Sequence, residues 1–221
     1  WALKDVHSVT LFEKDARLGG HANTVSIRYD DADIDVDTGF IVYNEPNYPN
    51  LVALFRAHNV ETFASDMSFG VSDPDGFEWS SNGVGGLFAW KRNLTNASFL
   101  CMLGDIVRFS AAARADLAAD RLQAATLEDY VRDLKLGRSF LKHYLLPMGA
   151  AIWSTPEREM LGYPASSFLR FFDNHRLLHI NRPIWRSVKG GSRSYVRAIA
   201  ATLGDRIQAG DPVVGVRKGA H

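Results

Sequence analysis

The order of apolar and polar residues divides the chain into three stretches. Over the first 45 residues the two kinds alternate, as they do in half-buried strands. A hairpin is predicted between Val25–Tyr29 and Ile34–Val36, because the aspartate-rich segment Asp30–Asp33 separates them. Residues 49–59 have the apolar spacing of a short helix. A second hairpin is predicted around Ser72–Gly76, where a Pro-Asp-Gly sequence supplies the turn.

From about residue 87 to residue 172 the apolar spacing becomes helical. An apolar stripe is predicted over residues 99–109, and Cys101 within it is interpreted as a core residue. Thr126 is predicted to begin a helix, and another helix is expected over residues 138–153 with a kink at Pro147. The last stretch returns to mixed structure, with a helix over 192–203 and strands around Ile207 and 213–216.

Composition excludes several classes of protein. Lys and Arg together number 25, as do Asp and Glu, so no net charge favours nucleic acid or an anionic membrane surface. The single cysteine excludes an internal disulfide and favours a reducing, cytoplasmic location. No apolar run is long enough for a membrane-spanning segment. The composition says nothing about oligomeric state.

The residues that carry the most chemistry follow the first predicted strand. Glu13 ends that strand, where dinucleotide-binding folds place a carboxylate that binds the adenosine ribose. Arg17 can neutralise a pyrophosphate, and Gly19 and Gly20 let backbone N–H groups approach it closely. The alternative is a solvated carboxylate followed by an ordinary turn. The glycine turn that normally lies about 20 residues before the carboxylate would precede Trp1, so residues 1–6 are interpreted as the tail of a crossover helix.

Three segments resemble one family: residues 17–24 (RLGGHANT), 37–44 (DTGFIVYN) and 190–196 (GGSRSYV). They are similar to flavoproteins of the amine oxidase, protoporphyrinogen oxidase and phytoene desaturase superfamily, and most closely to bacterial amine-oxidase-like proteins. The resemblance covers nearly the whole chain but only the middle of the family's usual length. It therefore predicts a fragment that lacks both ends of the flavoprotein.

The resemblance implies FAD as cofactor and assigns residues to it. Glu13 would bind ribose, and Arg17, Gly19 and Gly20 would lie along the pyrophosphate toward the flavin. The segment with Gly39 would pass close to the flavin ring.

Further positions follow from the resemblance. Phe40 would form a wall of the ring pocket, and Asp37 is a weaker candidate there. Val213 matches a late-strand valine whose backbone meets adenine, and it is expected to be buried in that strand. His21 follows the glycine pair and would lie near the flavin, unless it has a surface or capping role.

The predicted fold class is α/β: an incomplete Rossmann-like FAD/NAD(P)-binding domain with β-hairpins and a helical substrate-domain insertion. Residues 1–66 and 186–221 would form the FAD-binding part, and residues 67–185 a mainly helical substrate-binding lobe.

Two local features have structural explanations. His175 and His179 have the i, i+4 spacing of ligands on one helix face, but no third ligand has suitable spacing, so no metal is predicted. Ser192 is expected to cap the helix that follows Gly190 and Gly191.

The implied function is that of an FAD-dependent oxidoreductase, which takes a hydride from a substrate C–H bond. The substrate would be a small molecule, either an amine or an apolar compound, and no catalytic residue is assigned. Three alternatives remain open. They are a lipid or polyene desaturase or isomerase, an NAD(P)-dependent dehydrogenase, and an inactive truncated module without the phosphate-binding glycine turn.

Overall fold

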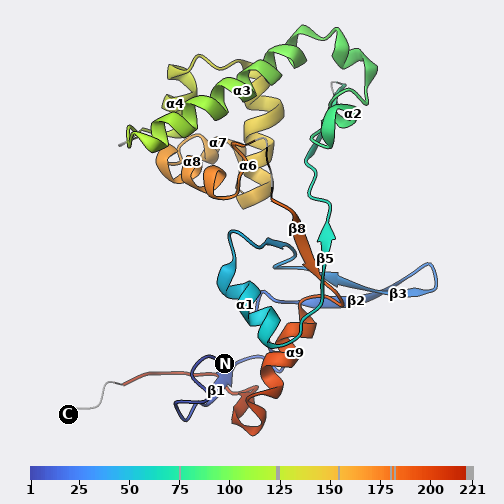
Figure 1. Cartoon of the computed structure of the whole chain (residues 1–221), viewed down its shortest axis with the longest axis vertical. Helices are drawn as coiled ribbons and strands as arrows, with labels where there is room; N and C mark the ends of the chain where they lie inside the picture. Colours follow the sequence, from blue (N-terminus) through green and yellow to red (C-terminus); the bar gives the residue numbers. More distant parts are fainter. Residues whose placement is uncertain (75, 123–124, 154, 180, 182, 218–221) are drawn as a thin grey trace. The chain divides into compact units, whose positions relative to one another are not determined.

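The computed structural model describes residues 1–217 except 75, 123–124, 154, 180 and 182. The chain divides into two compact units, whose residues can be followed in Figure 1 by the colours, which run along the sequence. The first unit comprises Trp1–Ser65 and Ile184–His221, and the second comprises Asp66–Pro183.

The strands of the first unit form three small sheets. Strand β1 (Leu11–Glu13) pairs in parallel with β9 (Ile207–Ala209). Strands β2 (Thr24–Tyr29) and β3 (Ala32–Asp37) form an antiparallel hairpin, and β4 (Tyr43–Asn44), β8 (Trp185–Val188) and β5 (Thr62–Ser65) form a sheet in that order. The helices are α1 (Pro49–Ala57), α9 (Arg193–Ala201) and the 3-10 turn η3 (Gly204–Arg206).

The β2–β3 hairpin confirms the first predicted turn. Asp30 and Asp31 both have positive φ, 44° and 60°, which is the geometry of a two-residue turn that matches strand twist. Alternation places apolar residues of both strands on one face and Thr24, Asp35 and Asp37 on the other. In Figure 1 the hairpin projects from the rest of its unit.

Helix α1 is also formed as predicted. Pro49 stands in its first turn, where the missing N–H costs no hydrogen bond. Phe55 on α1 packs against Tyr195 on α9 with ring centroids 5.1 Å apart. These two rings, Tyr43 and Val188 are the buried core of this unit.

Two elements expected in this unit are not formed by the described residues. The first residues form turns rather than a helix, with a single helix-like bond from the His7 N–H to the Leu3 carbonyl. The predicted strand over residues 213–216 is absent, although the strand at Ile207 forms. Beyond Asp211, whose N–H donates to the carbonyl of Glu13, the described chain pairs with no neighbouring strand, and β-branched residues adopt a strand only where they can pack in a sheet.

The second unit begins with a hairpin and continues as helices. Strands β6 (Gly70–Asp73) and β7 (Phe77–Ser80) pair as predicted. Its helices are α2 (Gly83–Leu87), η1 (Lys91–Leu94), α3 (Ala97–Ala118), α4 (Leu127–Asp133), α5 (Arg138–Phe140), η2 (Leu141–Leu145), α6 (Leu146–Trp153), α7 (Glu157–Met160) and α8 (Ala165–Asn174). Among the described helices, none is long and apolar enough to cross a membrane.

Local sequence explains where several of these helices begin and bend. Thr126 and Asp129 form a reciprocal capping box at the start of α4, as the sequence predicts. The expected kinked helix over residues 138–153 consists of α5, the π-helical turn η2 and α6. The π turn ends at Leu145, two residues before Pro147, whose ring and missing N–H disturb regular helix bonding.

The core of the second unit is built from aromatic rings. Five phenylalanines have 0% exposure: Phe99, Phe109, Phe140, Phe168 and Phe172. The Trp79 indole donates a hydrogen bond to the carbonyl of His143 at 3.0 Å, so the indole N–H is satisfied inside the core.

The interpretation of Cys101 as a core residue is wrong, because its side chain is exposed. Helix α3 buries Phe99, Met102, Phe109 and Ala113. Cys101 lies two positions after Phe99, about 200° around the helix, and therefore points away from this stripe.

Candidate cofactor site

Glu13 stands at the carboxyl end of a strand with a parallel neighbour. Open α/β sheets bind nucleotides at the carboxyl ends of such strands. The Glu13 Oε1 accepts a hydrogen bond from the Asp15 N–H at 2.9 Å, which turns the carboxylate toward the loop that follows β1. The carbonyl of Glu13 accepts a hydrogen bond from the Asp211 N–H at 3.0 Å, so the residues that follow β9 lie next to Glu13.

Arg17 organises the loop that follows. Its guanidinium donates to the carbonyls of Leu18 at 3.2 Å, Gly20 at 3.0 Å and Ala22 at 3.4 Å. Gly19 and Gly20 have φ values of +112° and +56°, which let the loop fold around the guanidinium. Arg17 thus supports the loop and places a positive charge within it.

The glycine loop touches the segment after β3 backbone to backbone. The Phe40 N–H donates to the carbonyl of His21 at 3.2 Å, and the Thr38 N–H donates to the carbonyl of Asn23 at 2.9 Å. A Cβ added at Gly39 would collide with the carbonyl of His21. Gly39 is therefore required by this contact, whatever else lies beside it.

The structure brings together most of the residues that the resemblance assigns to the cofactor. The loop of Gly19, Gly20 and His21 lies against Gly39 and Phe40, and the side chain of His21 is exposed. Phe40 is half-buried, with its ring 5.9 Å from that of Tyr48 in an edge-to-face arrangement.

Val213 does not have the environment that was expected. It lies outside any strand and is 63% exposed, so the expectation of a buried strand residue is wrong. The last backbone hydrogen bond from this segment to β1 runs from the Asp211 N–H to the carbonyl of Glu13, two residues before Val213. A backbone contact between Val213 and adenine stays a prediction.

The role of Asp37 was missed by the sequence analysis. Its carboxylate lies at the N-terminus of α9, where it accepts from the Ser192 N–H at 2.9 and 3.0 Å and from the Ser192 hydroxyl at 2.9 Å. The Thr24 hydroxyl donates to Asp37 at 2.6 Å and accepts from the Arg193 N–H at 2.9 Å. A carboxylate is stabilised there by unpaired N–H groups and by the helix dipole.

Ser192 therefore does not cap α9 as expected. Its backbone is already helical and its side chain makes no capping bond, because Asp37 and Thr24 supply the oxygens. Gly191 has φ +76°, and a Cβ there would lie 2.6 Å from Thr24 and 3.0 Å from Asp37. Gly191 thus makes room for Thr24 and Asp37 of the hairpin. The glycine pair before α9 was the sequence feature that could have indicated this close approach.

A second set of charges extends the same contact. Arg193 donates to Asp35 at 2.6 Å and to the Ser26 hydroxyl at 2.9 Å. The hydrogen bond from Ser26 and the Arg193 charge outweigh desolvation and lower the pKa of Asp35. Burial, aided by the Asp37 charge, raises the pKa of Tyr195 on α9. The polar face of the hairpin is thereby attached to the first turn of α9.

The two histidines with metal-ligand spacing have separate environments. His175 follows the end of α8 and its Nδ1 lies 2.9 Å from the carbonyl of Phe171. His179 pairs with Asp173 at 2.7 Å. The two rings do not share a helix face, and the described residues contain no group of three metal-ligating side chains.

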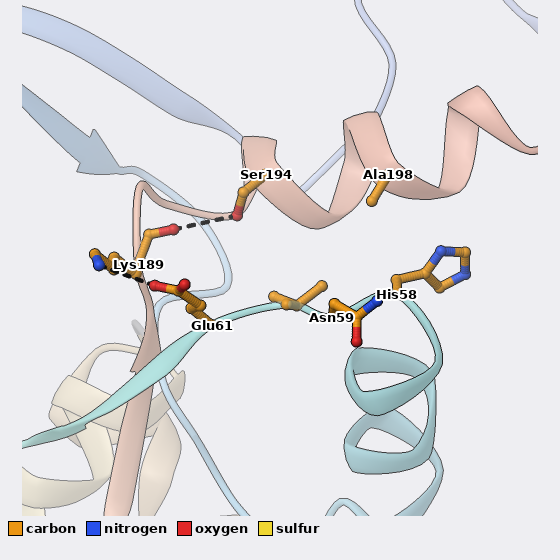
Figure 2. Close-up of a pocket in the computed structure, with 7 residues that line it drawn as sticks. His58, Asn59, Glu61, Lys189, Ser194 and Ala198 are labelled. Atoms are coloured by element: carbon orange, nitrogen blue, oxygen red, sulfur yellow. Dashed lines mark hydrogen bonds and ion pairs between the residues drawn. The ribbon is translucent and has the colours of Figure 1, made fainter.

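The first unit also contains a small open pocket of about 260 Å³. It lies between α9 and the residues that follow α1, as Figure 2 shows, and it is lined by His58 and Asn59 among others. Lys189 and Glu61 pair with each other there at 2.9 Å. None of the residues proposed for the cofactor lines this pocket, and its paired charges offer a ligand no net charge.

Comparison with known proteins defines the class. The fold matches solved structures of putrescine oxidase. The wild-type enzyme bound to putrescine aligns with a TM-score of 0.66 and 16% identity over 94% of this chain and 46% of that chain. A double mutant of the same enzyme aligns with a TM-score of 0.66 and 17% identity over 95% of this chain and 46% of that one. At these identities the likeness concerns the fold, and the chain spans about half the length of these structures.

The family follows from the sequence match. The family model of flavin-containing amine oxidoreductases matches residues 1–221, whereas no curated protein matches the chain. The chain belongs to the flavin-containing amine oxidoreductase family. This is a family of FAD-dependent oxidoreductases, and the cofactor is FAD. The fold class is the FAD-binding α/β fold that the sequence predicted.

Proposed function

We propose that the intact protein oxidises a small-molecule amine and that this chain supplies part of its FAD site and part of its substrate lobe. The supporting observation is the contact between the Gly19–Gly20 loop and Gly39, in a chain whose whole length matches the amine oxidoreductase family. The unit of residues 1–66 and 186–221 would hold FAD. Residues 67–185 would form the mainly helical substrate lobe.

Glu13 is proposed to bind the adenosine ribose. Its carboxylate can accept hydrogen bonds from two hydroxyl groups, and it stands at the carboxyl end of a strand in a parallel pair. The adjoining loop would cover the pyrophosphate. Arg17 adds a positive charge there, while Gly20 has nothing within 4 Å of a Cβ position and leaves the backbone accessible.

The flavin ring is proposed to lie beside His21, Gly39 and Phe40. These residues come from two loops whose backbones are already bonded to each other, so a bound ring would meet a rigid surface. Phe40 would form an apolar wall. His21 would lie at the edge of this surface, and its exposed side chain is compatible with that position.

The reaction proposed is oxidation at the carbon next to the amine nitrogen. Bound FAD would supply a hydride acceptor: the C–H bond would break with its electron pair leaving as hydride, the nitrogen lone pair would form the carbon–nitrogen double bond of an iminium ion, and dioxygen or another acceptor would restore the oxidised cofactor. An amine is favoured as substrate because one structure with this fold is putrescine oxidase bound to putrescine. We assign no catalytic residue.

An absorbance spectrum of the intact protein tests the proposal first. We expect flavin bands, release of FAD on heating, and bleaching when an amine is added without oxygen. Glu13→Ala and Arg17→Ala should each lower the FAD content of the purified protein, and Lys142→Ala in the other unit serves as control. A colourless protein that takes up no added FAD would refute the proposal. Unchanged FAD content in both variants would refute the two residue assignments.

A further inference from the structure

The β2–β3 hairpin has one apolar face and one polar face, and the polar face is the one attached to the rest of its unit. Alternation places six apolar residues on the first face, which we call the apolar hairpin face: Val25, Ile27, Tyr29, Ala32, Ile34 and Val36. Its five large side chains are 39–63% exposed. On the other face, Thr24, Asp35 and Asp37 are hydrogen-bonded to the start of α9. The hairpin therefore directs its apolar side away from the contact that holds it.

The β6–β7 hairpin of the second unit shows the usual arrangement. Phe77 and Trp79 on β7 are 7% and 6% exposed, and both belong to the core of that unit. An antiparallel sheet normally packs its apolar face on a core and leaves its polar face to solvent. The β2–β3 hairpin has the opposite arrangement among the described residues. A contiguous exposed apolar surface of this kind is typical of an interface.

Two other features of the same unit are incomplete within the described chain. Strand β1 pairs with β9 alone, so each of these strands has an edge without a neighbour. Val213, Val214 and Val216 have strand propensity but no strand to pair with, and they are 63%, 96% and 89% exposed. Further elements packed on this unit would account for all three features. A second copy bound at the hairpin would account for the hairpin alone.

The comparison with solved structures indicates where such elements would come from. The putrescine oxidase structures align with this chain over 46% of their own length, so more than half of each has no counterpart in residues 1–221. The apolar hairpin face contains no charged residue. It therefore fits a surface of aliphatic and aromatic side chains, which is the chemistry of a protein interior.

We infer that the apolar hairpin face is an internal interface of the intact protein, covered by apolar side chains from the part of the polypeptide outside residues 1–221. The inference does not rest on the proposed function, since it concerns packing and not FAD. Strand β3 ends at Asp37, and Gly39 and Phe40 follow directly. The covering segment would therefore also hold in place the loop that is proposed to lie beside the flavin ring.

Photo-crosslinking in the intact protein tests this contact directly. Tyr29→p-benzoylphenylalanine places a photoreactive ring on the apolar hairpin face. Arg28→p-benzoylphenylalanine places the same group on the opposite face and is the matched control. We expect irradiation to join residue 29 to a peptide from outside residues 1–221 of the same molecule, which stays a monomer on a denaturing gel. The control should form no such link.

Thermal unfolding of the intact protein is the second test. Ile27→Asn should lower the melting temperature by about 5 °C or more, because it places an amide in an apolar interface. Arg28 is 66% exposed, and Arg28→Asn should change the melting temperature by less than about 2 °C. The melting temperature of the wild type should not depend on protein concentration, because the covering segment belongs to the same molecule.

Several outcomes would contradict the inference. A link from residue 29 to another part of residues 1–221 would mean that this chain covers the face itself. A cross-linked dimer, with a melting temperature that rises with concentration, would assign the face to a second copy, and a link to a different protein would assign it to a separate partner. The absence of any link, or equally small effects of Ile27→Asn and Arg28→Asn, would show that the face stays exposed. The cross-link decides the question even if Ile27→Asn does not fold.

Discussion

The two units are stabilised in different ways. In the unit of residues 66–183, five phenylalanine rings are completely removed from solvent, and each has another aromatic ring as a neighbour within a core that also contains aliphatic side chains. In the unit that holds the candidate site, the buried core is much smaller and the apolar face of the β2–β3 hairpin is exposed, including Ile27 and Tyr29. The other face of that hairpin is attached to α9 by Asp37, Thr24 and Arg193.

This difference shows what each unit requires of its sequence. Apolar packing has no fixed direction and depends on volume, so the helical unit needs large rings at helical spacing. The unit that holds the candidate site instead needs backbones that approach each other closely and carboxylates positioned to accept hydrogen bonds from specific N–H and hydroxyl groups. Gly39, Gly191 and Asp37 meet those needs, and each has a specific partner far away in the sequence.

The largest effect is expected from a cavity in the helical unit. Phe109→Ala should lower the free energy of unfolding by about 3–5 kcal/mol, because a completely buried ring is replaced by a void. Urea unfolding followed by circular dichroism measures this. Val107→Ala on the same helix is the control, since Val107 is 69% exposed and its replacement should change stability by less than about 0.5 kcal/mol. Equal effects would contradict the packing described.

A smaller loss is expected when the carboxylate at α9 is removed. Asp37→Ala should cost about 2–3 kcal/mol, because it leaves the Ser192 N–H and hydroxyl without their acceptor. Asp37→Asn should cost less, as it retains one acceptor oxygen. Hydrogen exchange should locate the loss in α9. If amide hydrogen exchange in α9 of Asp37→Ala were the same as in the wild type, the Asp37–Ser192 contact would not stabilise the helix.

Removal of the capping box in the helical unit should lower the free energy of unfolding by less than removal of the Asp37 carboxylate. Thr126→Ala removes the side-chain cap of α4 and should cost about 1 kcal/mol. The hydrogen bonds from Thr126 lower the pKa of Asp129 from 3.8 to about 2, ahead of the contribution of Arg132. A lowered pKa in the folded state stabilises the protein above about pH 4, and this contribution is lost as the pH falls toward 2.

The pH dependence provides the check on that capping box. Between pH 4 and pH 2 the wild type should lose more stability than Thr126→Ala, because the variant no longer holds the carboxylate in its ionised form. Urea midpoints at several pH values measure the difference. Parallel curves would mean that the cap does not stabilise the ionised Asp129.

The smallest effect is expected at the ion pair beside the open pocket of Figure 2. Glu61 and Lys189 are 2.9 Å apart, but their side chains are 71% and 73% exposed. The partners lower the pKa of Glu61 and raise that of Lys189, yet solvent screens the pair. Glu61→Gln should leave both the melting temperature and FAD content unchanged. A clear loss of FAD would show that this pocket belongs to the cofactor site.

Local patterns in the sequence predicted much of the fold. Alternation and turn residues predicted both hairpins, and helical spacing with Thr126 predicted α1 and the start of α4. These elements depend on residues that are near each other in the chain. The motif around Arg17, Gly19 and Gly39 also indicated the family that the comparison confirms.

Other features required the tertiary structure because their partners are distant in the sequence. The place of Asp37 at α9 depends on residues 155 positions away. The residues around Val213 have strand propensity but no strand to pair with in the described chain, and Cys101 faces solvent because α3 buries a different stripe. Sequence spacing determines local geometry, whereas burial and long-range hydrogen bonds exist only after the chain has folded.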